Sequence, residues 1–227
     1  MHIGSGFLSP PVWGAMAAVS GACVAGSLAL AGRRLDERKV PLMGVMGAFV
    51  FAAQMVNFSI PFVPGTSGHL GGGLLLGVLL GAPLGIIVMA SILVVQALVY
   101  QDGGIEALGA NIFTMGILAC LLGALVRPLW TRPRPGRMAD IITFAAGVVG
   151  LVASATLVIL MMWWSGSVPR GVSLLEALGA MDGVHFLIGV VEGLASVAVV
   201  RFVLSMRREA VLGIDAPAPD PAKEAAR

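Results

Sequence analysis

The chain has 227 residues, of which 58% are hydrophobic and only 11% are charged, with a net charge of +2. So few charges cannot cover a water-soluble globule of this size, and this excludes a soluble domain. Apolar stretches long enough to cross about 30 Å of hydrocarbon recur along nearly the whole chain. We therefore expect an all-α integral membrane domain over residues 1–205 and a cytoplasmic, disordered tail over residues 206–227.

The predicted elements begin with a short polar cap, residues 1–9, which is too short to span a bilayer. Seven apolar spans follow, at about 10–32, 40–60, 70–80, 83–100, 105–126, 140–163 and 182–203. The third is short and carries Gly73, Gly77 and Gly81 at four-residue spacing, which is typical of tightly packed membrane helices. Its length indicates that the preceding loop enters the bundle, where protein surrounds the backbone.

The basic residues separate cleanly between the two sides of this predicted seven-helix bundle. With alternating crossings, thirteen of the 14 Lys and Arg residues fall on one side, and only Arg170 falls on the other. The positive-inside rule then places the N-terminus outside and the C-terminus in the cytoplasm. In this topology all three histidines, His2, His69 and His185, lie at the external side, which favours one outward-facing site.

The dipeptide Met1-His2 is a candidate chelator. The α-amine, the backbone amide nitrogen of His2 and Nδ1 of the same imidazole can close two fused rings around one cation. A plane of nitrogens suits Ni(II) or Cu(II) better than the tetrahedral preference of Zn(II). We expect His69, in the glycine-rich stretch Gly65-Thr66-Ser67-Gly68-His69, to supply the fourth nitrogen. The alternatives are that a Met-His start arises by chance and that His69 only hydrogen-bonds a loop carbonyl.

Further polar residues near the external side are candidates for surrounding or gating this site. Gln54 and Asn57 lie about one turn apart at the outer end of the second span. They are expected either to orient the imidazoles or to hydrogen-bond between helices. The same candidate set includes residues of the histidine loop and of the turn between the fourth and fifth spans: Thr66, Ser67, Asp102, Glu106 and Asn111. For Asp102 and Glu106 the favoured alternative is solvation of an external turn.

His185 and Glu192 complete the candidate set. They are seven residues apart in the last span and therefore share one helix face. Glu192 is an intramembrane carboxylate with no basic neighbour in sequence, which marks it as a functional or network residue.

Several motifs are missing from the sequence. It contains neither a G-x-x-x-x-G-K-[ST] phosphate loop nor H-E-x-x-H, so we expect a chain that does not hydrolyse ATP and is not an enzyme. The basic stretch over 127–137 is interpreted as a juxtamembrane anchor rather than a nucleic-acid site. Cys23 and Cys120 lie in apolar runs and are interpreted as buried packing residues.

Four stretches carry a resemblance to a known family: MHIGSGFLSP, GAFVFAAQMVNFSIPFVPGTSGHLGGG, QALVYQDGGIEALGANIFTMG and HFLIGVVEGL. They resemble the CbiM/NikM family, the substrate-specific membrane (S) components of energy-coupling factor transporters for cobalt and nickel. The resemblance covers most of the chain to about Val203. It departs at Ser5, where the family usually has an acidic residue.

The resemblance implies a seven-helix bundle in which nitrogens of Met1, His2 and His69 hold the metal on the outer side. It implies Ni(II) or Co(II) as transported substrate, with no organic cofactor. The implied partners are a membrane coupling (T) protein, cytoplasmic ATPase subunits and a small accessory membrane subunit, within the inner cell membrane. Two alternatives stay open, a membrane metalloenzyme with zinc at His69 and His185, and a secondary metal carrier working alone. The residues also leave the choice between nickel and cobalt open.

Overall fold

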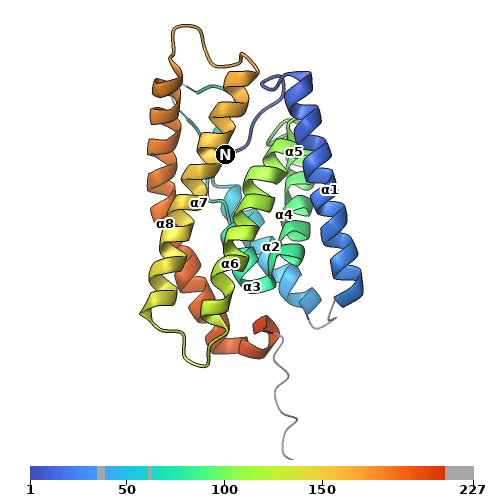
Figure 1. Ribbon diagram of the computed structural model, residues 1–227, viewed down its shortest axis with the longest axis vertical. Helices are drawn as coiled ribbons and strands as arrows, with labels where there is room; N and C mark the ends of the chain where they lie inside the picture. The colour runs from blue at the N-terminus through green and yellow to red at the C-terminus, as the bar shows by residue number, and fades with distance from the viewer. Residues whose placement is uncertain (35–38, 61–62, 213–227) are drawn as a thin grey trace, which may run out of the picture.

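The protein is a bundle of long helices into which its own N-terminal segment is inserted (Figure 1). The computed structural model describes residues 1–34, 39–60 and 63–212. In these ranges the helices are α1 (Pro10–Arg34), α2 (Val40–Gln54), α3 (Gly73–Leu80), α4 (Ala82–Val95), α5 (Leu108–Asn111), α6 (Ala119–Trp130), α7 (Arg137–Trp164) and α8 (Leu174–Leu212). Two π-helical segments continue α4 and α5, η2 (Gln96–Tyr100) and η3 (Ile112–Leu118).

Among the described residues, five helical stretches are long and apolar enough to cross a membrane. They are Pro10–Gly32, Ala82–Tyr100, Leu108–Trp130, Arg137–Trp164 and Leu174–Met206. The predicted class of an all-α, multi-pass membrane protein is therefore confirmed. The second and third predicted spans are shorter helices, α2 with 15 residues and α3 with 8.

The predicted second span is too long. Helix α2 ends at Gln54, and the chain then forms strand β1 (Phe58–Ser59), which pairs antiparallel with β2 (Ser67–Gly68). This hairpin satisfies backbone groups that a helix would otherwise have to pair. The third span starts at Gly73 rather than at residue 70, because Gly72 has a left-handed φ of 77° and cannot continue a helix.

The part of the α2–α3 loop that carries His69 lies inside the protein, as its sequence predicted. Among the described residues of this loop the side chains of Ile60, Val63, Thr66 and His69 are buried, whereas residues 56–59 are exposed. Helix α3 follows at the centre of the bundle, and all eight of its residues are buried. A Cβ atom at Gly77 would collide with the backbone oxygen of Cys120 in α6, so the predicted glycine spacing does allow close helix contact.

Two further helix boundaries differ from the prediction. Helix α6 continues to Trp130, and Arg127 within it donates from Nη1 to the last carbonyls of α3, Val78 O at 3.0 Å and Leu79 O at 2.8 Å. The predicted basic loop therefore begins later than expected. Helix α7 begins at Arg137 rather than at residue 140.

The last helix begins earlier than predicted and ends later. It begins at Leu174 because Ser173 and Glu176 form a capping box, with Glu176 N donating to Ser173 Oγ at 3.2 Å and Ser173 N donating to Glu176 Oε2 at 2.8 Å. It extends to Leu212, so the first part of the predicted tail is helical. The rest of that tail, residues 213–227, lies outside the described residues.

The two cysteines differ in their surroundings. Cys120 is fully buried in the core, as expected, whereas Cys23 is only partly buried on α1. The interpretation of both as buried packing residues is therefore wrong for Cys23. Both thiols are free, so neither forms a disulfide.

The two ends of the bundle carry different charges. The α7–α8 connection, with Arg170, lies at the upper end in Figure 1, whereas the α6–α7 connection lies at the lower end. At that lower end Arg201 of α8 forms a bidentate pair with Asp140 of α7, with both N–O distances at 2.7 Å. Arg170 therefore lies at the end of the bundle opposite to Arg201 and the basic α6–α7 connection, which is the separation expected from the charge pattern.

Candidate metal-binding site

The site is built on the first residues of the chain, which lie deep in the upper half of the bundle (Figure 1). Met1, His2 and Ile3 are only 1%, 3% and 0% exposed. A segment this short cannot bury itself, so its position depends on partners from distant parts of the chain. The predicted structured cap is therefore confirmed, and it forms part of the core.

The backbone of the segment pairs on both sides. Ile3 forms an isolated antiparallel bridge with Thr66, and Gly4 N donates to Gly65 O at 2.8 Å. On the other side Gly104 N donates to Ile3 O at 2.8 Å. The N-terminal segment thus lies between the histidine loop and the turn that precedes α5.

Two side chains anchor the segment further. Asn111 accepts from Ile3 N at 2.9 Å and donates back to Ile3 O at 3.2 Å. Glu106 accepts from Ser5 Oγ at 3.2 Å and from Gly6 N at 2.6 Å. Hydrogen bonds from its own backbone N–H and from Gly6 lower the pKa of Glu106. Solvation is therefore not the only role of Glu106, because its carboxylate also anchors Ser5 and Gly6.

The imidazoles of His2 and His69 lie side by side. Their ring centroids are 4.6 Å apart with an interplanar angle of 31°. His69 Nδ1 donates to Leu70 O at 2.7 Å, so the loop-carbonyl alternative holds for that nitrogen. In the described part of the chain, the buried atoms His2 Nδ1 and His69 Nε2 have no hydrogen-bond partner. The sequence predicted Nδ1 of His2 as a ligand, whereas for His69 it left the choice between the two ring nitrogens open.

The other two predicted nitrogens meet at one hydroxyl. The amine of Met1 and the amide of His2 both donate to Ser67 Oγ, at 3.3 Å and 3.2 Å. Ser67 therefore holds both nitrogens of the predicted chelate ring in one place. Thr66, its neighbour, instead donates to Val63 O at 2.8 Å and shapes the loop.

Burial disfavours protonation of the Met1 amine and of the two imidazoles. It lowers the pKa of the Met1 amine well below its ordinary value, although Asp102 partly opposes this. It lowers the pKa of His2 to about 3, with the nearby N-terminal charge acting in the same direction. The pKa of His69 is also lowered well below 6.5, chiefly by burial. These shifts favour the unprotonated forms of the Met1 amine and of both imidazoles, which are the forms that bind metal ions.

Asp102 supplies a carboxylate beside the two rings. Its Oδ1 lies 3.3 Å from His2 Nδ1, and its Oδ2 accepts from Asn57 Nδ2 at 2.9 Å. Partial burial raises the pKa of Asp102. A carboxylate at this distance favours positive charge where the ring nitrogens converge. Asn57 thus orients Asp102 and does not form a contact between long helices.

Gln54 and Gln96 are fully buried behind His2. Gln96 Oε1 lies 3.1 Å from His2 Nε2, and Gln96 Nε2 donates to Gln54 Oε1 at 3.0 Å. Gln54 Nε2 then donates to Gly71 O at 2.5 Å. Sequence reasoning missed Gln96, although a lone amide inside an apolar span was a usable signal. It is the first residue of the π-helical segment η2, an irregularity common at functional sites.

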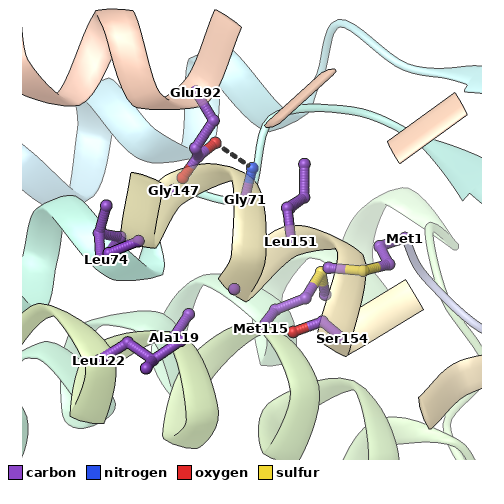
Figure 2. Close-up of a pocket in the computed structure, with 12 residues that line it drawn as sticks. Met1, Gly71, Leu74, Met115, Ala119, Leu122, Gly147, Leu151, Ser154 and Glu192 are labelled. Atoms are coloured by element: carbon purple, nitrogen blue, oxygen red, sulfur yellow. Dashed lines mark hydrogen bonds between the residues drawn. The ribbon is translucent and has the colours of Figure 1, made fainter. Parts of the chain in front are cut away.

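Glu192 supports the histidine loop from α8. Its carboxylate accepts from Gly71 N at 2.7 Å (Figure 2). It also accepts from Gly72 N at 2.7 Å. Figure 2 also shows that the side chains of Met1 and Met115 both reach the small cavity beside Glu192. The Met1 side chain is therefore held in an apolar pocket while its amine faces Ser67.

His185 does not join the other two histidines. It is fully buried, and its Nδ1 donates to Met181 O at 2.8 Å within α8. In residues 1–34, 39–60 and 63–212, no three His, Cys, Asp or Glu side chains form a group that can hold a metal ion.

Comparison with known proteins agrees with this geometry. The family described as the cobalt uptake substrate-specific transmembrane region, CbiM, matches residues 2–210. The chain belongs to the CbiM family. The relatives of this CbiM-family chain are named as metal transport proteins.

Individual relatives cover nearly all of the chain. A putative metal transport protein of Haloquadratum walsbyi is 34% identical, over 93% of this chain and 93% of its own length. A putative fused nickel transport protein NikMN of Archaeoglobus fulgidus is 36% identical, over 93% of this chain and 68% of its own length. The crystal structure of a truncated transition metal transporter superposes with a TM-score of 0.77 at 28% identity, over 90% of this chain and 99% of that one.

Proposed function

We propose that this chain is the substrate-binding (S) subunit of an energy-coupling factor transporter, and that it captures Ni(II) or Co(II) on the outer face of the membrane. The ion is held by four nitrogens, the Met1 amine, the amide and Nδ1 of His2, and Nε2 of His69. The observation that carries the proposal is that His2 Nδ1 and His69 Nε2 are buried without partners on adjacent rings, beside the amine.

The chemistry of this donor set suits the proposed substrates. Four nitrogens replace the water shell of the ion. A planar arrangement of these nitrogens suits an ion such as Ni(II), whose d-electron count favours that geometry. Chelation removes the amide proton of His2, whose N–H meets Ser67 Oγ at 3.2 Å. Ser67 Oγ then loses this N–H donor, because the lone pair of the deprotonated nitrogen is used to bind the ion.

The proposed topology has seven crossings, with the N-terminus and all three histidines outside and the C-terminus in the cytoplasm. The separation of Arg170 from Arg201 and the basic α6–α7 connection supports this orientation. The membrane is then the inner cell membrane, and the lipid bilayer covers the apolar helices.

The proposed partners supply the energy. A membrane coupling (T) protein and cytoplasmic ATPase subunits would drive reorientation, with a small accessory membrane subunit as a further component. Two relatives support a multi-subunit assembly by name, the fused NikMN protein and a putative fused cobalt transport protein CbiMQ of Methanocorpusculum labreanum. The chain spans only 37% of the length of that CbiMQ protein. No nucleic acid has a role in this proposal.

Metal analysis of the purified protein tests the proposal. We expect the native protein to retain nickel or cobalt after gel filtration, and we expect His2→Ala, His69→Ala and a one-residue N-terminal extension each to lose it. An extended chain that retains its ion would overturn the role of the amine. It would support instead a site made of side chains alone, such as the zinc enzyme alternative. Metal uptake in cells that lack any partner ATPase would support the stand-alone carrier.

A further inference from the structure

Four groups form a continuous hydrogen-bond chain behind the candidate metal site. From His2 Nε2 it passes through the amides of Gln96 and Gln54 to the backbone oxygen of Gly71, with successive distances of 3.1, 3.0 and 2.5 Å. Both glutamines are 0% exposed, so water does not offer their amides another partner. We call this chain the glutamine relay.

The direction of the relay follows from its last member. The oxygen of Gly71 can only accept, so Gln54 must present its NH₂ group to it and its Oε1 to Gln96. Gln96 must then present its own NH₂ group to Gln54 and its Oε1 to His2. Because that oxygen also can only accept, the proton of the neutral imidazole is drawn to Nε2, and Nδ1 keeps its lone pair.

A competing arrangement lies on the other side of the ring. Asp102 Oδ1 is 3.3 Å from His2 Nδ1, so a proton on Nδ1 would meet a carboxylate. That tautomer would block the nitrogen that is needed as a ligand. It would also place the lone pair of Nε2 against the lone pairs of Gln96 Oε1. Avoiding this contact would require the side-chain amides of both glutamines to flip, and the oxygen of Gln54 would then face the oxygen of Gly71 without a hydrogen between them.

The end of the relay is itself held in place. Gly71 N donates to Glu192 Oε2 at 2.7 Å (Figure 2), so the peptide that ends the relay is tied to α8. Gly71 lies two residues after His69. One loop therefore presents Nε2 of His69 and also provides the acceptor that orients the ring of His2.

We infer that Gln96 and Gln54 are positioning residues that hold His2 in its Nε2–H tautomer, so that Nδ1 can bind the ion without first losing a proton. The expected effect on metal binding rests on the proposed function. The tautomer itself is a property of the metal-free protein. Outer hydrogen bonds of this kind typically change metal affinity by about 10–100-fold.

The first test measures the tautomer directly. The chain has only three histidines, so ¹⁵N-histidine labelling of the metal-free protein in detergent, with His69→Ala and His185→Ala for assignment, resolves His2. We expect Nε2 of His2 to carry the proton in the native protein and Gln96→Leu to populate the Nδ1–H form. Gln96→Glu retains an acceptor and should keep the native tautomer. An Nδ1–H form in the native protein, or an unchanged tautomer in Gln96→Leu, would overturn the inference.

The second test measures nickel binding to the same proteins. We expect about 10–100-fold weaker binding in Gln96→Leu. The matched control is Gln101→Asn, because Gln101 is exposed and lies outside the relay. Gln101 has a left-handed φ of 55°, which asparagine tolerates. Equal affinities of Gln96→Leu and the control would contradict the relay's role. A native protein with the Nε2–H tautomer that binds no nickel would instead refute the proposed function and leave the tautomer assignment standing.

Discussion

Glu192 and Gly71 are joined by a 2.7 Å hydrogen bond, from the backbone N–H of the glycine to the carboxylate, across 121 residues of sequence. Gly72 N donates to the other carboxylate oxygen, also at 2.7 Å. The loop that carries His69 is thus fastened to the last helix by two charge-assisted bonds in a buried setting. The intramembrane carboxylate singled out from the sequence has a structural partner in the candidate site.

Replacing Glu192 by glutamine is expected to loosen this loop. In the glutamine one carboxylate oxygen is replaced by an NH₂ group, which cannot accept a hydrogen bond. One of the two buried glycine N–H groups would therefore lose its acceptor, at a cost of about 1–3 kcal/mol. We expect a lower midpoint of thermal unfolding and weaker nickel retention, measured on detergent-solubilised protein. The matched control is Glu176→Gln at the exposed start of α8, which should leave nickel retention unchanged. Equal nickel retention in the two variants would show that the carboxylate does not support the site.

Gly104→Ala should expel the N-terminal segment by steric conflict. A Cβ atom at Gly104 would lie 2.6 Å from Ser5 N, closer than packed atoms allow. We expect the variant to fold but to lose bound metal and to expose the first residues to an aminopeptidase. Gly136→Ala is the control, because a Cβ there meets nothing within 4 Å. A metal-replete Gly104→Ala protein would mean that the segment docks differently.

Asn111→Leu removes both hydrogen bonds that hold Ile3. The buried N–H of Ile3 then lacks an acceptor, which costs about 1–3 kcal/mol of docking free energy. Hydrogen exchange of residues 1–8, followed by mass spectrometry, should be faster in this variant. Thr114→Val serves as the comparison, since the Thr114 hydroxyl bonds only to carbonyls of its own helix. Identical exchange in the two variants would rule out Asn111 as an anchor.

Acid should release the N-terminal segment. Burial lowers the pKa of His2 from 6.5 to about 3. Below pH 6.5 the His2 imidazole therefore binds a proton when the segment is undocked but not when it is docked. The docked state therefore loses about 1.4 kcal/mol for each pH unit between 6.5 and about 3. The lowered pKa of the Met1 amine acts with the same sign below its ordinary value of 8.0. The backbone amides of residues 2–4 should become less protected from hydrogen exchange between pH 7.5 and pH 5.5, after correction for the intrinsic pH dependence of exchange. Constant protection over this range would contradict the burial of these nitrogens.

The residue pattern alone established the membrane class and the order of the apolar segments, because hydrophobicity is a local property. It also predicted Met1, His2 and His69 as metal ligands, because the chelating chemistry of a Met-His start is local, and this remains a prediction. Helix ends were less well predicted. The capping box of Ser173 and Glu176 was visible in the sequence but was not used, and the end of α2 depends on strand pairing between β1 and β2.

Only the tertiary structure decided how the candidate site is supported. His2 meets Gln96 across 94 residues, and His2 N meets Ser67 across 65. Hydropathy shows that a buried glutamine needs a partner but does not say which one, because the partner is chosen by how the helices pack. The orientation of the His2 ring, and with it the freedom of Nδ1 to bind an ion, is therefore a consequence of packing between distant segments.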